Sequence, residues 1–425
     1  MVRRRPAPEA VVAGRTEAWP MHEIPLADGP VRFRGALDLE RRPGGGLLPR
    51  RLPAWTREQY PDAFMDFVAT MPAGVRLAFR TAARALELDV LTSVRHFEGA
   101  ASPTGAGAFD LVVDGRLEAR AAAPVGRVLR LAHARARPRE VAGEPSTVRF
   151  RALPAGVKEV ELWLPQQTPC ELIALRADAE VAPPAPSGRR RWVHHGSSIS
   201  HCTQADGPTG TWPAVAAALG SLEPVNLGMA GNGMLDPFIA RTIRDLPTDL
   251  ISLELGLNPV LKSALKARTF VPAVHGFLDT VREGHPDTPL LVVSPVFCPR
   301  LESADAAAAT PPDTGGGPSG TGPRRRDAEP GLPGMGPDDS GREPGDPGEA
   351  SLAPLTLPVV REALERIVLQ RRRSDPHLYY LDGRELFGLR NAVDMPDGIH
   401  PNAAGYRTIG RRFAGRVLGS GGAFA

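Results

Sequence analysis

The chain has 425 residues, of which 42% are hydrophobic and 23% charged, as in an ordinary globular protein. Lys and Arg number 51 against 48 Asp and Glu, and a net charge as small as +3 says little about partners. Basic clusters occur at Arg3–Arg5, Arg189–Arg191 and Arg371–Arg373. They are not interleaved with aromatic residues, so we expect no nucleic-acid partner. No run approaches the roughly 20 apolar residues of a membrane span, so we expect no membrane partner either.

The cysteines and the N-terminus predict a cytoplasmic protein. Cys170, Cys202 and Cys298 cannot all pair and have no metal-ligand spacing, which suits a reducing compartment. The N-terminus is basic, but no apolar segment of signal-peptide length follows it. The length exceeds that of one ordinary core, which favours two domains.

Residues 1–185 alternate apolar and polar side chains with a period of two, as half-buried antiparallel strands do. The alternation occurs in Val31–Phe33, Val75–Phe79, Leu86–Val90, Val148–Phe150 and Val160–Leu162. Asp114-Gly115 lies between two apolar runs and predicts a hairpin turn. We therefore expect a β-sandwich accessory domain with a disordered N-terminus, followed by a proline-rich linker over Val181–Arg191.

Residues 186–425 alternate short apolar strands with amphipathic segments, which predicts a parallel sheet covered by helices on both sides. The expected strands are Trp192–His195, Val225–Leu227, Leu250–Leu255, Leu290–Val293 and Leu378–Leu381. Helical patterns cover Trp212–Leu219, Phe270–Glu283 and the segment from Tyr406 to Val417. One segment interrupts this order: twenty of the fifty residues in 301–350 are Gly or Pro, which predicts a disordered insertion.

Four polar segments each follow a predicted strand, at the edge where open parallel sheets bind ligands. The first, residues 196–200 (GSSIS), places serines at a strand-to-helix turn whose backbone N–H groups can stabilise an oxyanion. Alone, such a turn is more often a helix N-cap, and Ser200 replaces the second glycine of a G-x-S-x-G elbow. Ser197 and Ser200 are rival nucleophiles, and the Gly-x-Ser spacing favours Ser198.

The second and third segments offer donors for an oxyanion. Residues 226–232 (NLGMAGN) contain Gly231, whose backbone N–H is a candidate donor, and residues 254–258 (ELGLN) contain Asn258, whose side-chain amide is another. Each segment alone is more typical of an ordinary turn. Because both segments follow predicted strands, the two donors can reach the same oxyanion.

The fourth segment, residues 397–402 (DGIHPN), precedes the last helix. His400 is three residues from Asp397, so a loop can bring the carboxylate to one ring nitrogen. That contact leaves the other nitrogen to accept a serine proton. The alternative is a simple helix-start turn in which Pro401 supplies the geometry of the first turn.

Together and in this order, the four segments resemble the motif blocks of the SGNH/GDSL hydrolase family, over roughly Trp192 to Val417. The resemblance implies a flavodoxin-like three-layer α/β/α domain, preceded by a β-sandwich in a two-domain branch. It also implies Ser198 as the nucleophile with His400 and Asp397, and an oxyanion hole formed by Ser198, Gly231 and Asn258. That branch includes acyltransferases that act on polyketide hydroxyls.

The chain departs from the family pattern at two positions. Ser197 stands where the first block usually has aspartate, and Pro259 follows Asn258 where the third block usually has aspartate. Neither position belongs to the expected triad. The remaining histidines near the motifs, His194, His195 and His201, favour packing or substrate contact over catalysis.

The expected function is cleavage of a small-molecule acyl ester through an acyl-enzyme on Ser198. An acyltransferase would use the same residues, with an alcohol such as a natural-product hydroxyl in place of water. A non-catalytic carbohydrate-binding protein is a third possibility, against which the complete triad argues. No cluster has metal-ligand spacing and no glycine-rich nucleotide loop follows a strand, so we expect neither a metal nor a cofactor.

Overall fold

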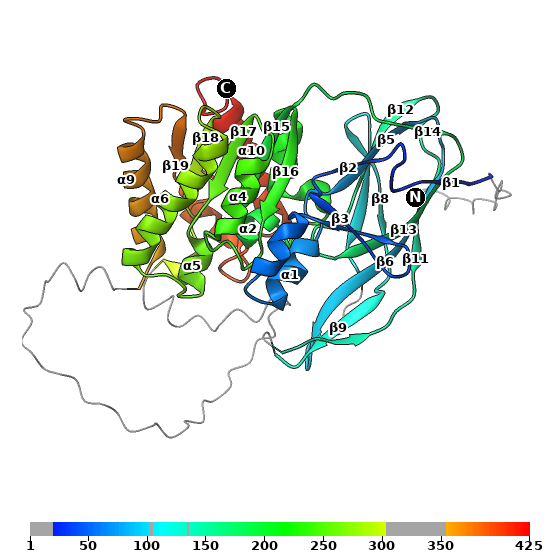
Figure 1. Cartoon of the computed structure of the whole chain (residues 1–425), viewed down its shortest axis with the longest axis horizontal. Helices are drawn as coiled ribbons and strands as arrows, with labels where there is room; N and C mark the ends of the chain where they lie inside the picture. The colour runs from blue at the N-terminus through cyan, green and yellow to red at the C-terminus, as the bar shows by residue number, and fades with distance from the viewer. Residues whose placement is uncertain (1–19, 103–104, 134–135, 303–353) are drawn as a thin grey trace, which may run out of the picture.

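The computed structural model describes residues 20–102, 105–133, 136–302 and 354–425. They form a mixed α/β fold with several sheets, in which a β-rich first half precedes a half that alternates strands and helices (Figure 1). The expected disorder of the N-terminus, before residue 20, and of the insertion, beyond residue 302, falls outside these ranges. Within them, no helix is both long enough and apolar enough to cross a membrane.

Two sheets occupy most of the first half, with eight and six strands among the described residues. The larger sheet contains β1 (His22–Ile24), β3 (Asp38–Arg41), β4 (Leu47–Arg50), β6 (Leu86–Phe97), β9 (Arg127–Leu131), β10 (Arg139–Val141), β11 (Ser146–Phe150) and β13 (Cys170–Ala177). The smaller one contains β2 (Arg32–Arg34), β5 (Arg76–Thr81), β7 (Ala108–Val113), β8 (Arg116–Ala122), β12 (Lys158–Trp163) and β14 (Val181–Ala182). Most neighbouring strands are antiparallel, whereas β6 and β9 are parallel.

Apolar side chains from both sheets form one buried cluster, which includes Leu77 and Phe79 of β5 and Leu88 of β6. The period-two alternation generates this cluster, because successive side chains of a strand point to opposite faces. All five segments that showed the alternation overlap strands. Asp114 and Gly115 form the turn between β7 and β8 with φ angles of 47° and 80°, so the expected hairpin is confirmed.

One helix of the first half was not expected from the strand pattern. The helix α1 (Ala63–Thr70) begins at Asp62, whose carboxylate accepts a hydrogen bond from the Met65 N–H at 2.8 Å. Met65 and Val68 of this helix are fully buried, and they belong to the hydrophobic cluster of the second half rather than to that of the two sheets. The first half of the chain therefore contributes to both cores.

The second half contains a five-stranded parallel sheet in the order β16-β15-β17-β18-β19. Its strands are β15 (Arg190–Gly196), β16 (Leu222–Gly228), β17 (Leu250–Glu254), β18 (Leu290–Val293) and β19 (Leu378–Leu381). All five expected strands are present. In sequence order the arrangement is 2-1-3-4-5, the order of flavodoxin-like sheets, in which ligands bind at the carboxyl ends of the strands.

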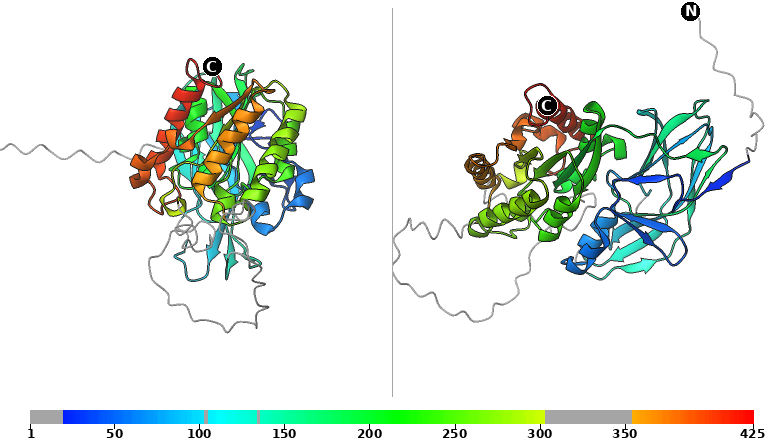
Figure 2. Two further views of the ribbon diagram at one scale, coloured as in Figure 1. Left: turned by 90° about the vertical axis from the view of Figure 1, so that its left-hand side faces the viewer. Right: turned by 45° about the horizontal axis from the view of Figure 1, so that its top comes forward.

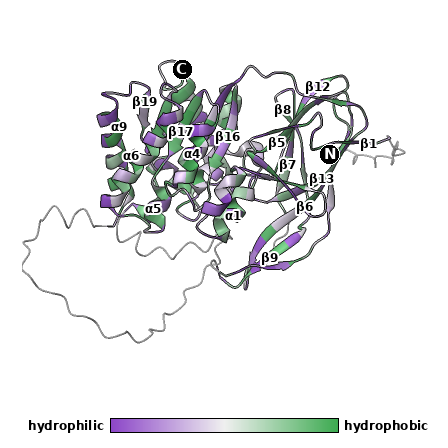
Figure 3. Cartoon of the chain, in the orientation of Figure 1, coloured by the Kyte–Doolittle hydropathy of each residue, from purple (hydrophilic) through white to green (hydrophobic). Residues whose placement is uncertain are grey.

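Helices alternate with these strands along the chain, as the sequence predicted. They are α2 (Ser198–His201), α3 (Trp212–Leu219), α4 (Pro237–Asp245), α5 (Leu257–Leu261), α6 (Ala267–Gly284), α9 (Leu357–Arg371) and α10 (Ala403–Phe413). The helix α3 packs against α10, whereas α6 packs against both α4 and α9, as Figure 2 shows for α6 and α9. Polar and apolar residues mix along α4, α6 and α9 in Figure 3, as in helices that cover a sheet.

An ion pair joins the described residues on either side of the segment 303–353. Glu302 accepts hydrogen bonds from both terminal nitrogens of Arg361 on α9, each at 2.8 Å. The same guanidinium donates to the carbonyls of Pro295 and Val296 at 2.9 and 2.8 Å. Leu301 is fully buried, so the first two residues of the segment 301–350 are part of the folded chain.

Three neutral histidines are buried around the end of β15. Burial lowers the pKa of His194 to about 3, that of His195 to about 4 and that of His201 to about 3. An unfolded chain would bind protons at these rings below their ordinary pKa of about 6.5, whereas the folded chain does not. Burial, with the nearby charge of Asp62, also raises the pKa of Asp236 to about 6, which has the opposite effect on stability.

The free energy of unfolding should therefore fall as the pH is lowered from 6.5 to 5. Each buried histidine contributes about 1.4 kcal/mol per pH unit once the unfolded ring is protonated, and the raised pKa values of Asp236 and Glu254 offset part of this effect. Urea unfolding at several pH values measures this slope. His195→Gln, which keeps a donor for the Leu227 carbonyl, should reduce the slope by about one proton. A stability that is constant over this interval would contradict the prediction.

Candidate active site

The end of β15 presents Ser198 at the start of a one-turn helix. Ser197 is the N-cap of α2, and its side-chain oxygen accepts a hydrogen bond from the Ile199 N–H at 3.1 Å. Ser198 is the first residue of α2, and its Oγ lies 2.8 Å from Nε2 of His400. The expected N-cap and the expected nucleophile are thus neighbouring serines of the same turn.

The loop before α10 holds His400 and Asp397 together. Nδ1 of His400 lies 2.7 Å from Oδ2 of Asp397, and Oδ1 of Asp397 accepts the backbone N–H groups of Ile399 and His400 at 2.9 and 2.7 Å. Burial alone would raise the pKa of Asp397, but the hydrogen bonds and charge of His400 hold it well below its usual value. The ionised carboxylate places the proton on Nδ1, so Nε2 accepts the Ser198 hydroxyl.

Asn258 lies in the first turn of α5, and Gly231 lies in the loop that follows β16. Asn258 is fully buried, and its Oδ1 accepts the Gly233 N–H at 2.8 Å, which orients the amide. Its Nδ2 has no hydrogen-bond partner among the described residues, which is unusual for a buried amide. Gly231 has a φ of 67°, a conformation that favours glycine. A donor that is buried, oriented and unused suits an oxyanion.

The two departures from the family pattern have local explanations. Pro259 lies in the first turn of α5, where a backbone N–H has no partner within the helix, so it does not disturb Asn258. Beside Ser197, the carboxylate is supplied by Glu254 of β17 instead. Oε2 of Glu254 accepts from the Ser197 N–H at 2.7 Å, from the Ser197 hydroxyl at 2.6 Å and from the Ser200 hydroxyl at 3.3 Å.

Glu254 is the residue of this site that the sequence analysis missed as a functional group. It is 6% exposed, and burial raises its pKa although the hydrogen bonds from Ser197 and Ser200 oppose this effect. The signal was present, since Glu254 is the one charged residue of β17 and ends this buried strand. Its role became visible only with the contacts to the serine turn.

A series of hydrogen bonds connects the serine turn to the sheet below it. His194 contacts Ser200 Oγ through Nε2 and Ser252 Oγ through Nδ1, each at 2.7 Å, and Nε1–H of Trp192 donates to Ser252 Oγ at 2.8 Å. The expectation that His194 packs rather than catalyses agrees with this burial. The hydroxyls of Ser197 and Ser200 contact Glu254 and His194, and the hydroxyl beside His400 is that of Ser198.

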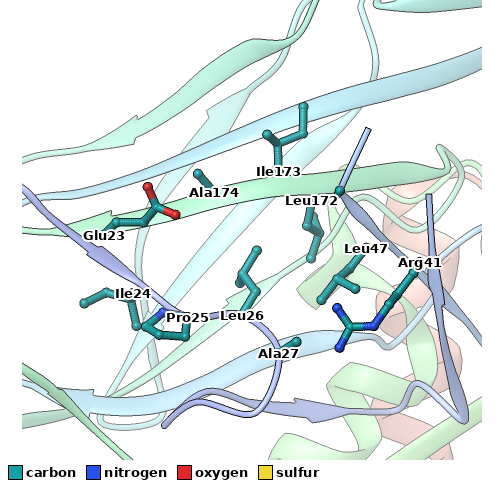
Figure 4. Close-up of a pocket in the computed structure, with 11 residues that line it drawn as sticks. Glu23, Ile24, Pro25, Leu26, Ala27, Arg41, Leu47, Leu172, Ile173 and Ala174 are labelled. Carbon is teal, nitrogen blue, oxygen red and sulfur yellow. The ribbon is translucent and has the colours of Figure 1, made fainter. Parts of the chain in front are cut away.

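A depression in the first half is separate from these residues (Figure 4). It is lined by residues 23–27, by Leu47 of β4 and by residues 172–174 of β13, with Glu23 and Arg41 as its charged side chains. None of its lining residues belongs to the serine turn, to the His400 loop or to α5, which contains Asn258. Within the described ranges, no group of three His, Cys, Asp or Glu residues is placed to hold a metal ion.

Comparisons with known proteins find one matching family and several similar structures. Residues 31–172 match the family described as SsfX3, N-terminal domain, whereas a comparison with curated proteins gives no match. The chain is similar to the salicylyl-acyltransferase SsfX3 from a tetracycline biosynthetic pathway, with a TM-score of 0.72 and 26% identity over 92% of this chain and 95% of that one.

Two further structures share the fold over most of their length. A GDSL-like lipase from Bacteroides ovatus has a TM-score of 0.64 and 16% identity, over 93% of this chain and 96% of that one. A family two carbohydrate esterase from Cellvibrio japonicus has a TM-score of 0.50 and 12% identity, over 93% and 96%. The similar structures are thus described as an acyltransferase, a lipase and a carbohydrate esterase, and each similarity extends over at least 92% of this chain. The match of residues 31–172 and the similarity of nearly the whole chain to SsfX3 fit the two-domain branch of the SGNH/GDSL family.

Proposed function

We propose that the chain is a serine esterase that cleaves a small-molecule acyl ester through an acyl-enzyme on Ser198. The observation that supports this most strongly is the unbroken contact from Ser198 Oγ through His400 to Asp397, with distances of 2.8 and 2.7 Å. A nucleophile within hydrogen-bonding distance of a base, itself oriented by a carboxylate, is the arrangement that activates a serine.

In the first step, Ser198 Oγ attacks the ester carbonyl while His400 Nε2 removes the hydroxyl proton. The carbonyl oxygen becomes an oxyanion, which the N–H groups of Ser198 and Gly231 and the amide of Asn258 stabilise. Collapse of this intermediate breaks the ester bond. His400 then returns the proton to the departing alcohol, and the acyl group remains on Ser198.

In the second step, water attacks the acyl-enzyme and His400 removes its proton. The same three donors stabilise the second oxyanion, and the acid leaves as the Ser198 hydroxyl is restored. The ionised Asp397 stabilises the histidine while it carries the proton. No step needs a group outside the chain other than the ester and water.

Acyl transfer is the second candidate, and the similarity to the salicylyl-acyltransferase SsfX3 favours it. An alcohol would replace water in the second step, with His400 removing the alcohol proton. The residues and the acyl-enzyme are identical in the two reactions. They differ in how well the site excludes water from the acyl-enzyme while it admits the alcohol.

The proposal includes the finer architecture that the family implies. The 2-1-3-4-5 strand order and the helix pairs α3–α10 and α4–α6–α9 support a flavodoxin-like three-layer domain. The shared core of the two β-rich sheets supports a β-sandwich before it. We also propose a cytoplasmic location, which the three free cysteines, Cys170, Cys202 and Cys298, support.

A fluorophosphonate probe should label Ser198 in the wild-type protein, because it reacts with activated serines. Ser198→Ala should abolish labelling and lower ester turnover by about 10⁴-fold or more, since the triad acts as a unit. Ser200→Ala removes a hydroxyl two residues away and should still be labelled at Ser198. Mass spectrometry of the labelled peptide locates the probe. Loss of labelling in Ser197→Ala combined with retention in Ser198→Ala would show that the nucleophile is assigned wrongly.

Free acid should be the main product from an activated ester when alcohols are added. Chromatography of the products, with the rate of probe labelling as a measure of the acylation step, separates the two candidates. If a new ester forms in proportion to the added alcohol while free acid declines, the enzyme is an acyltransferase and the hydrolytic proposal is wrong.

Asn258→Ala should lower kcat by about 10²- to 10³-fold with a smaller effect on KM, because the amide acts mainly when charge develops on the carbonyl oxygen. Asn258→Asp keeps an acceptor for the Gly233 N–H but replaces the donor by an acceptor, so it should be at least as slow. Steady-state kinetics on an activated ester measure both variants. A change confined to KM would mean that Asn258 contacts the substrate instead of the oxyanion.

A further inference from the structure

Arg51 connects the first half of the chain to the serine turn. It follows β4 and is fully buried, and all five of its N–H groups have acceptors. The acceptors are the carbonyls of Met71, Val68, Asn226 and Gly228 and the ring nitrogen Nδ1 of His201, at 2.6, 2.9, 3.1, 2.6 and 3.1 Å. None of them is a carboxylate.

Carbonyl groups at the end of α1 stabilise the buried guanidinium of Arg51. Val68 lies in the last turn of α1 and Met71 is its C-cap, so two acceptors are carbonyls at the negative end of the helix dipole. Burial lowers the pKa of Arg51 to about 9, which leaves the side chain charged at neutral pH. The guanidinium is therefore held by oriented carbonyl dipoles.

Two other acceptors belong to the strand that leads to Gly231. Asn226 and Gly228 end β16, directly before the loop that contains Gly231. Gly228 lies so close to α2 that a Cβ there would be 2.5 Å from the backbone nitrogen of His201. The side-chain amide of Asn226 also donates to the Ser200 carbonyl at 3.0 Å. Arg51 thus holds the point where the Gly231 loop and the Ser198 helix touch.

His201 extends the contact to the helix itself. It is the last residue of α2, which Ser198 begins. Because Nδ1 of His201 accepts from Arg51, its proton lies on Nε2, which donates to the Gln166 carbonyl at 2.7 Å. Arg51 and Gln166 both precede the parallel sheet in the chain. The first half therefore holds the nucleophile helix through both nitrogens of one ring.

We propose that Arg51 is a positioning residue, which sets the Ser198 helix and the Gly231 loop relative to each other and makes the first domain a structural part of the active site. This inference rests on the proposed function of Ser198 and Gly231. Arg51 is not a catalytic residue, because it acts through carbonyls and His201. A small displacement of the nucleophile relative to the oxyanion donors would slow the chemical step.

The chain offers a matched control in Arg76 of β5. Arg76 is also a buried arginine of the first half, 1% exposed, and it donates to the carbonyl of Pro224 at 3.2 Å. Pro224 lies on the same strand β16, further from the Gly231 loop. Arg76→Lys thus weakens a contact between the same two parts of the chain, away from the serine turn.

The experiment compares full-length Arg51→Lys and Arg76→Lys with the wild type. We expect Arg51→Lys to lower kcat for a small activated ester, and the rate of fluorophosphonate labelling, by about 10- to 100-fold with little change in KM. Arg76→Lys should change either rate by less than about threefold even if its melting temperature falls. Both variants are assayed well below their melting temperatures, so loss of folded protein does not contribute.

Equal losses in the two variants, or no loss in Arg51→Lys, would overturn the inference. If Arg51→Lys does not fold, His201→Leu, which removes the ring contacts to Arg51 and to the Gln166 carbonyl, takes its place in the same comparison. Absence of labelling in the wild-type protein would overturn the proposed function and this inference with it. Labelling of the wild type at Ser198 with equal losses in the two arginine variants would overturn this inference alone.

Discussion

One oxygen atom, Oε2 of Glu254, holds the turn on which the active site is built. It accepts three hydrogen bonds from the residues on either side of Ser198, namely from the backbone and hydroxyl of Ser197 and from the hydroxyl of Ser200. The position of Ser198 is therefore fixed by bonds that its neighbours make, and its own hydroxyl stays available for His400. A buried carboxylate needs such donors and the turn needs an acceptor, so Oε2 and the turn satisfy each other, whereas Oε1 has no hydrogen-bond partner among the described residues.

The hydrogen bonds below the turn have one consistent set of directions when the Ser200 hydroxyl donates to Glu254. Because the Ser200 hydroxyl donates to Glu254, it accepts from Nε2–H of His194, whose Nδ1 then accepts the hydroxyl of Ser252. Ser252 in turn accepts the indole N–H of Trp192. A protonated His194 would have no lone pair for Ser252, so the chain requires the neutral ring that burial already favours. The buried polar side chains of this sheet thus form a continuous series of hydrogen bonds.

Much of this arrangement was predictable from the sequence because it depends on local patterns. The strand periods placed Ser198, Gly231, Asn258 and His400 at one edge of a parallel sheet, and the spacing of Asp397 and His400 allowed a contact within one loop. Three features were not predictable. The helix α1 is a short segment within a strand-rich region, and Glu254 and Arg51 act through partners that are distant in sequence. No periodicity encodes which buried charge meets which turn.

The ion pair between Glu302 and Arg361 has a consequence for how this chain can vary. It joins the last described residue before the segment 303–353 to the first helix after it, and the same arginine holds two carbonyls beyond β18. The end of β18 and the start of α9 are therefore held together by contacts among the described residues. Insertions or deletions within that segment could accumulate during evolution without shifting the register of the sheet. Without the ion pair, a change in the length of this segment would more readily shift β18 and α9 relative to each other.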